Sequence, residues 1–330
     1  TKNLLECKKS TKKMQKMSIT LSIISLLAIL YLIFIIKQNP IKEYEISIYS
    51  SLPINFWACL SLIYCMNILL LGYAASKMDM QFWKINFFTI LLLTFIFLSL
   101  GSLRGYFLYN HGDPMYHLGR IKDFLSIGYS SEDLYPILHL LVVAGVKITG
   151  LYPENIMRYW PSLTYVFYLL LLYLLSKLVL ESRNQVILVI AASTPFLYNS
   201  ICVSVYPHAF ASYFIPLFFY LYFRRGDSIL LTICFLALLV AYPFIHPATA
   251  LMILSFIIAM ELTRKFIFRE KYSLEIIFIS FIVLFTWISS HYIFGMSIRN
   301  IISALKGEYQ ARWVEVTKSM FEGLDFTEFV

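Results

Sequence analysis

The feature that most constrains this chain is a succession of nine long apolar stretches separated by short polar segments. Several of them approach or exceed the ~20 apolar residues that cross the ~30 Å hydrocarbon core of a bilayer as an α-helix. Only 14% of the residues are charged, against roughly a quarter in a soluble domain. The sequence therefore predicts an all-α polytopic transmembrane helical bundle with nine spans. The stretches cover residues 18–36, 54–75, 85–108, 159–180, 186–205, 209–223, 228–245, 248–263 and 273–294.

The basic residues divide unevenly between the two sides of the predicted bundle. Six lysines lie in the first 16 residues, and each short loop rich in Lys or Arg between the later stretches falls on the same side as this tail. Because cytoplasmic loops carry an excess of Lys and Arg, the pattern predicts a multi-pass protein of the cell membrane with a cytoplasmic N-terminus. The net charge of +8 is concentrated in this tail, so we expect contact with membrane lipids and none with nucleic acid.

This orientation requires residues 136–149 to stay on one side of the membrane. The segment has 14 residues and contains a histidine and a lysine, which makes it short and polar for a span. We therefore expect one long outer loop over residues 109–158 that contains two short interfacial helices. The first begins at Asp113, because Asp is a favoured N-cap and Pro114 suits the first helical position. The second ends at Gly150, because glycine readily adopts the left-handed conformation that closes a helix.

Three regions follow from this topology. Residues 1–84 are expected to form a basic cytoplasmic tail and two transmembrane helices, and residues 85–295 a seven-span module that includes the long outer loop. In residues 296–330, apolar positions recur at helical spacing after the last span, which predicts an outer interfacial segment. No terminating pattern follows, so we expect this segment to be the start of a larger region of a longer chain.

Histidine is confined to the predicted outer side of the bundle. Three separate outer turns carry histidine, and two of these residues, His208 and His246, are next to proline. Proline fixes the local backbone and thereby limits the direction of the imidazole. This placement indicates chemistry at the outer membrane surface rather than passive anchoring. The histidines are His111, His117, His139, His208, His246 and His291.

Asp113 is the candidate catalytic residue. A carboxylate with neighbouring imidazoles can act as a general base, and Asp113 with His117 can also hold a divalent cation. An ordinary helix cap is the alternative interpretation of Asp113. The outer arginines suit phosphate groups, because a guanidinium group binds phosphate in a bidentate manner. The candidate substrate-binding residues are His111, His117, Arg120, Arg158, His208 and His246.

Residues 85–330 resemble the GT-C superfamily of membrane glycosyltransferases. Asp113 opens a long outer loop directly after a span, in the stretch Gly-Asp-Pro-Met-Tyr-His. The loop holds two predicted short helices and the segment Tyr-Pro-Ile-Leu-His at residues 135–139, and six further spans and another outer segment follow. In this chain His111 stands at the first position of the family's two-acid motif, D/E-x-D/E, which leaves the use of a divalent cation open.

The resemblance implies an integral membrane glycosyltransferase with Asp113 as its catalytic acidic residue. Its donor would be a sugar linked to polyprenyl phosphate, and transfer would occur with inversion on the outer face of the membrane. The acceptor, which is a glycan, a lipid or a protein, stays open. Two other classes also remain open: a lipid or polysaccharide transporter with the outer polar cluster as its gate, and a non-catalytic scaffold subunit with a GT-C-like fold.

Overall fold

The computed structural model describes residues 2–43, 45, 47–76, 80–108, 113–129, 133–194, 200–269 and 273–291. Throughout these ranges the regular structure is helical, with no strand. The chain divides into two compact units, residues 1–256 and 257–330. Helix α13 (Pro247–Phe266) runs from the first unit into the second, and the described part of the second unit also contains α14 (Leu274–Ser289).

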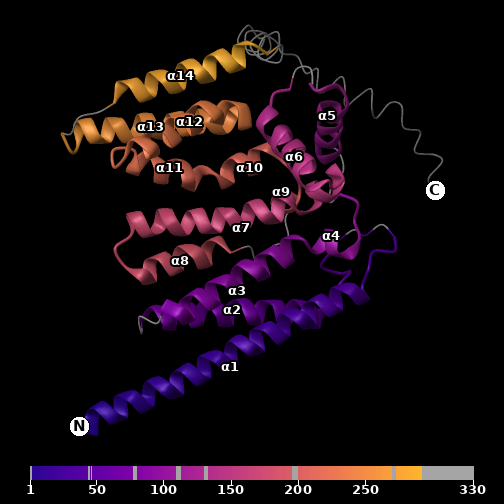
Figure 1. Cartoon of the computed structure of the whole chain (residues 1–330), viewed down its shortest axis with the longest axis vertical. Coiled ribbons are helices and arrows are strands. Elements are labelled where there is room, and N and C mark those ends of the chain that lie inside the picture. Colours follow the sequence, from indigo (N-terminus) through magenta and orange to yellow (C-terminus); the bar gives the residue numbers. More distant parts are fainter. Residues whose placement is uncertain are drawn as a thin grey trace, which may run out of the picture. The chain divides into compact units, whose positions relative to one another are not determined.

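Figure 1 shows the remaining helices, all in the first unit. They are α1 (Lys2–Gln38), α2 (Ile54–Ser76), α3 (Met80–Leu98), α4 (Leu100–Arg104), α5 (Asp113–Ile127), α6 (Pro136–Thr149), α7 (Pro153–Val179), α8 (Arg183–Ser193), α9 (Ser200–Val203), α10 (Pro207–Tyr213), α11 (Ile215–Arg224) and α12 (Ile229–Ile245).

The described residues include five helical segments that are long and apolar enough to cross a membrane. Three further apolar helices, α6, α12 and α14, are shorter. The prediction of an all-helical membrane protein is thus supported at this level, while nine spans remain a prediction. The five segments are Ile19–Gln38, Ile54–Ser76, Gln81–Leu98, Pro153–Val179 and Pro247–Phe266.

Two of the expected spans are interrupted where proline follows in the sequence. Helix α8 ends at Ser193, and Thr194 has an extended backbone with ψ of 130°, as is favoured for a residue that precedes proline. The expected span over residues 209–223 divides at Phe214, between α10 and α11. Ile215 begins the next helix, and Pro216 lies in its first turn because it has no N–H with which to continue the preceding helix.

The main apolar core of the first unit lies where α1, α2 and α3 pack with α7 and α8. Phe56, Leu93 and Leu169 are fully buried in this core. One buried polar contact joins two of its parts: the Ser99 hydroxyl donates to Ser162 Oγ at 2.7 Å and thereby links the α3–α4 junction to α7. Buried hydroxyl groups need such partners, because an unsatisfied polar group in an apolar interior is costly.

A buried ion pair between Arg104 and Glu45 links the end of α1 and the following loop to α4. Arg104, whose side chain is 2% exposed, faces both carboxylate oxygens of Glu45. Its Nε also donates to the Asn39 carbonyl at 2.7 Å, and the Tyr106 hydroxyl donates to Glu45 at 2.6 Å. Burial alone would raise the pKa of Glu45, but the hydrogen bonds from Arg104 and Tyr106 lower it below its usual value. The pair is therefore charged and hydrogen-bonded on both sides.

The second unit also contains a buried carboxylate. Glu261 in α13 is fully buried, and its Oε2 accepts a hydrogen bond from the Ser273 backbone N–H at 2.9 Å. Arg264, one turn later in α13, lies 3.6 Å from the other oxygen. These contacts connect the end of α13 to the start of α14.

Candidate active site

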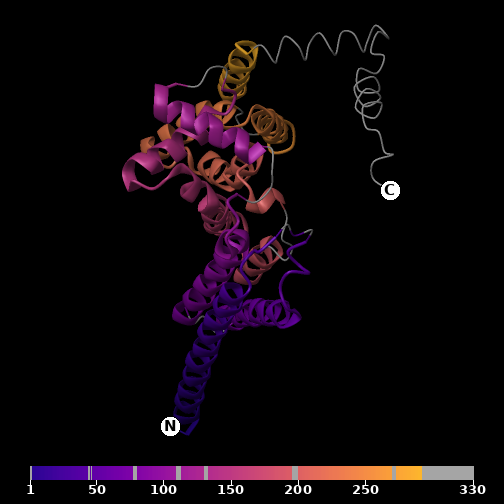
Figure 2. The same ribbon diagram turned by 90° about the vertical axis from the view of Figure 1, so that its right-hand side faces the viewer.

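A polar cavity lies at the end of the first unit that carries α5 and α6. These two helices pack against each other and against α7, and α6 also packs against α12. Figure 2, which looks onto this end, shows α5 and α6 in front of helices seen nearly along their axes. The cavity has a volume of about 180 Å³. Its lining residues are Asp113, Tyr116, His117, Tyr135, Tyr206, Pro207, His208 and His246.

Asp113 is the first residue of α5, where the sequence predicts the helix to begin. Its side chain is exposed at the cavity and makes no hydrogen bond or ion pair with the other described residues. Negative charge is favourable at this position, because the N-terminus of a helix carries a partial positive charge. The carboxylate is therefore available to a molecule that enters the cavity.

Next to the cavity, three buried side chains form a relay, which is a row of residues joined by hydrogen bonds. Asp133 Oδ2 lies 2.6 Å from His139 Nδ1, and His139 Nε2 lies 2.9 Å from His117 Nδ1. The Tyr135 backbone N–H donates a hydrogen bond to the second oxygen of Asp133 at 3.0 Å. His139 is fully buried, and His117 and Asp133 are 3% and 7% exposed. Of the three, only His117 lines the cavity.

A row of rings from three separate segments also lines the cavity. Tyr135, at the start of α6, stacks on His246 with ring centroids 5.6 Å apart. His208 from α10 follows at 6.0 Å from His246, and Tyr206 lies 5.2 Å from His208. Burial, followed by the neighbouring Tyr116 and Asp113, raises the pKa of Tyr135, so its hydroxyl remains a proton donor at neutral pH.

His246 also caps the next helix. Its Nδ1 accepts a hydrogen bond from the Thr249 backbone N–H at 3.2 Å, and the Thr249 hydroxyl lies 2.8 Å from the same nitrogen. The first N–H groups of a helix have no partner within the helix, so a side-chain acceptor at this position stabilises α13. The proline that follows, Pro247, is at the first helical position, where proline is preferred.

The structure thus brings Asp113, His117, His208 and His246 together around one cavity. The two candidate arginines lie outside its lining. Arg120 donates to the Tyr116 hydroxyl at 3.0 Å, with its guanidinium over the Tyr116 ring. Arg158 donates to the Phe107 carbonyl at 2.7 Å and to Asn155 Oδ1 at 3.4 Å. His111 and the segment 296–330 lie outside the described residues.

The described residues alone do not complete the coordination of a divalent cation at this site. Within the described part of the chain, no three His, Cys, Asp or Glu side chains lie close enough together to hold a metal ion. Asp113 and His117, the pair that the sequence offers as ligands, both line the cavity. Water and oxygen atoms of a substrate are ligands that could add to this pair.

Sequence reasoning missed Asp133, Tyr135 and Tyr206. In the sequence, Asp133 ends the stretch Ser-Ser-Glu-Asp, whose residue types favour a helix start, so the sequence alone indicates only a local capping role. One oxygen does serve that local purpose, since it accepts from Tyr135 N–H. The bond from the other oxygen to His139 has no periodic signal in the sequence, because six residues and a helix start separate the two.

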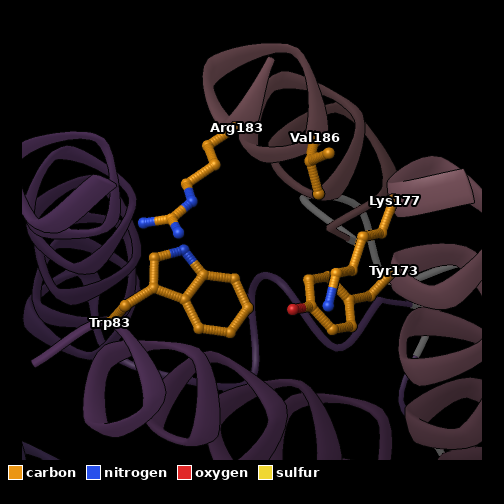
Figure 3. Close-up of a pocket in the computed structure, with 5 residues that line it drawn as sticks. All are labelled: Trp83, Tyr173, Lys177, Arg183 and Val186. Carbon is orange, nitrogen blue, oxygen red and sulfur yellow. The ribbon is translucent and has the colours of Figure 1, made fainter. Parts of the chain in front are cut away.

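The other end of the first unit is basic. Figure 1 shows the α7–α8 turn opposite to α5 and α6. There a small pocket of about 90 Å³ is lined by Trp83, Tyr173, Lys177, Arg183 and Val186, and Figure 3 shows the two cationic side chains reaching towards the two aromatic rings. Helix α7 has 27 residues and is therefore about 40 Å long. The histidine cavity and the basic pocket lie at its opposite ends.

Acidification is expected to destabilise the folded protein through two cavity histidines. Burial first, and then the neighbouring His139, lowers the pKa of His117 to about 4, and burial with His208 does the same for His246. Between pH 6.5 and 4 the unfolded chain binds protons that the folded chain does not, so stability falls as the pH falls through this range. His117 alone accounts for a slope of up to about 1.4 kcal/mol per pH unit.

Thermal unfolding in detergent between pH 7.5 and 5 measures this slope. The variant His117→Gln should show a shallower loss of stability between pH 6.5 and 5 than the wild type, because glutamine does not titrate. Equal slopes in the two proteins would show that His117 is not held neutral in the folded state.

Comparison of the chain with protein-family models, curated proteins and solved structures found no match.

Proposed function

We propose that this chain is an integral membrane glycosyltransferase of the GT-C type, which transfers a sugar from a polyprenyl-phosphate donor to an acceptor hydroxyl with inversion. The observation that carries the proposal is the convergence of Asp113 with histidines from three segments around one cavity. These segments, α5, α10 and the α12–α13 turn, are distant in sequence. A capping role for Asp113 alone would not require histidines from the other two segments beside it.

The proposed chemistry assigns a defined task to Asp113. Its carboxylate takes the proton of the acceptor hydroxyl, the acceptor oxygen attacks the anomeric carbon, and the bond from that carbon to the phosphate oxygen breaks. The polyprenyl phosphate leaves with the electron pair. A positioned general base of this kind typically contributes ~10²–10⁴-fold to the rate. The Tyr135 hydroxyl, as a proton donor at neutral pH, can hold a sugar oxygen nearby.

The proposed topology has nine spans, with the N-terminus in the cytoplasm and the cavity at the outer face. Helices α5 and α6 are then interfacial helices of one outer loop. This orientation is supported by the distribution of charge in the first unit, since Lys177 and Arg183 lie at the opposite end of α7 from the cavity. Cytoplasmic loops are the ones that favour Lys and Arg.

The donor phosphate is proposed to lie near Arg120 or Arg158, outside the histidine cavity. Arg120 reaches the cavity through Tyr116, to which it donates a hydrogen bond. A guanidinium group beside the leaving phosphate would stabilise the negative charge that develops there. The lipid tail, which cannot leave the bilayer, would lie between the spans.

The first test is sugar transfer by the full wild-type chain in lipid, with radiolabelled polyprenyl-phosphate sugars as donors. Formation of a labelled product that requires the protein is the expected result, and loss of transfer on addition of a chelator would assign a divalent cation to the reaction. Movement of lipid-linked sugar across the membrane without transfer would instead favour a transporter. Neither transfer nor movement with any donor would favour a scaffold subunit.

A further inference from the structure

We propose that two hydrogen-bond networks give two cavity histidines opposite polarities: His117 Nε2 is an obligate acceptor, and His246 Nε2 is an obligate donor. The cavity thereby selects an uncharged sugar ring and disfavours a phosphodiester. The class of ligand rests on the proposed function, whereas the polarities of the two nitrogens follow from hydrogen bonds within the protein.

The first network fixes the proton of His117. A carboxylate only accepts hydrogen bonds, so Asp133 Oδ2, at 2.6 Å, requires a proton on His139 Nδ1. When His139 carries one proton, its Nε2 can only accept, and His117 Nδ1 at 2.9 Å must donate to it. A singly protonated His117 then has a lone pair on Nε2. This nitrogen makes no hydrogen bond with the described residues, and His117 lines the cavity.

The second network fixes the proton of His246 in the opposite way. The Thr249 backbone N–H can only donate, so His246 Nδ1 holds a lone pair. The single proton of a neutral imidazole is then on Nε2, which becomes a donor. Because the cap satisfies an N–H group at the start of α13, the fold itself maintains this tautomer.

A ligand that satisfies both nitrogens must donate to His117 and accept from His246. Hydroxyl groups do both, whereas a phosphodiester, such as that of a polyprenyl-phosphate sugar, has no O–H group with which to donate to the lone pair of His117. The burial that lowers the pKa of both histidines to about 4 keeps each ring singly protonated at neutral pH. The donor and the acceptor are therefore permanent features of the cavity under physiological conditions.

The two histidines and the size of the cavity together indicate a ligand of one ring. The Tyr135 ring neighbours both histidines, with its centroid 6.1 Å from that of His117 and 5.6 Å from that of His246. A ring that carries several hydroxyls can donate to one nitrogen and accept from the other at the same time. The cavity of about 180 Å³ is smaller than the ~300–1,000 Å³ pockets of drug-sized ligands. A single sugar residue meets both conditions.

The tautomers are measured by nitrogen-15 NMR of the histidine rings in the full chain in lipid, because protonated and unprotonated ring nitrogens have different shifts. The variants His117→Gln and His246→Gln, made separately, assign the two rings by loss of their signals. At pH 7.5 the expected result is a proton on Nδ1 alone for His117 and on Nε2 alone for His246. A proton on His117 Nε2, or on His246 Nδ1, would overturn the proposal.

Ligand class is tested in the same spectra by adding a panel of uncharged methyl pyranosides, a polyprenyl-phosphate sugar, or dimethyl phosphate. A pyranoside or the lipid-linked sugar is expected to shift both Nε2 signals, and dimethyl phosphate, which has no O–H group, is expected to leave the His117 Nε2 signal in place. A response to the lipid-linked sugar alone assigns the cavity to the donor sugar, and a response to a free pyranoside alone assigns it to the acceptor. A shift of His117 Nε2 by dimethyl phosphate, or no shift by any sugar, would refute the sugar site.

These spectra require no turnover, so they separate this site from the proposed reaction. The expected tautomers and sugar-induced shifts without transfer from any donor would retain the sugar site and refute the glycosyltransferase. Transfer with the opposite tautomers would retain the enzyme and refute the polarity assigned to the two histidines.

Discussion

Asp113→Asn is expected to lower the rate of sugar transfer by about 100-fold or more while leaving the fold intact. Asparagine has nearly the same shape but cannot take up the proton of an acceptor hydroxyl. The helix should still form, because Asn and Asp are equally good at a helix start. Asp113 is exposed and makes no bond with other described residues that the exchange would break. Initial rates at saturating donor, with thermal unfolding as a check on folding, measure the effect.

Asp123→Asn is the matched control. Asp123 is also exposed on α5 and carries the same charge, but it does not line the cavity. Its exchange should leave the transfer rate at the wild-type value, which excludes a general effect of net charge on binding to lipid. If Asp113→Asn retained wild-type activity, Asp113 would be a helix cap and not a catalytic residue.

Glu45→Ala is expected to lower the free energy of unfolding by about 3–5 kcal/mol. The exchange leaves the Arg104 guanidinium buried without a carboxylate, with only the Asn39 carbonyl still bonded to its Nε. An uncompensated buried charge of this kind is strongly destabilising, because the desolvation cost is no longer offset. Thermal or denaturant unfolding of the protein in detergent measures the loss.

Two further variants separate the buried charge from other causes. Glu43→Ala removes an exposed carboxylate from the same loop and should change stability little. The double variant Glu45→Leu with Arg104→Met replaces both charges with apolar groups and should recover much of the loss, since a buried ion pair is often no better than well-packed apolar residues. If the double variant is as unstable as Glu45→Ala, packing rather than charge dominates at this site.

Local signals predicted the helices well where a single residue decides the backbone. The start of α5 at Asp113 and the end of α6 before Gly150, whose φ is 69°, both follow from residues that favour helix termini. Hydropathy was less informative between residues 186 and 223, because apolar composition continues through Thr194 and Phe214, where the helices end. In the sequence, a proline that follows each of these positions indicates that the helix ends there.

The members of the candidate site that carry chemistry in the sequence were largely predictable, whereas the contacts between its buried side chains were not. One-sided histidines and an acidic residue after an apolar stretch pointed to Asp113, His208 and His246, which line one cavity. The relay of Asp133, His139 and His117 depends on the packing of α5 against α6, which brings His139 next to His117. Residues 22 positions apart that meet through tertiary packing leave no pattern in one sequence.

The cap that His246 provides for α13 has a consequence for biogenesis. Chains enter a membrane from the N-terminus, so α1, α2 and α3 can assemble while later segments are still being synthesised. The cavity wall at His246 is fixed only after Thr249 has been added and the first turn of α13 has formed. A nascent chain that ends before Thr249 therefore lacks the contact that fixes the His246 side of the cavity.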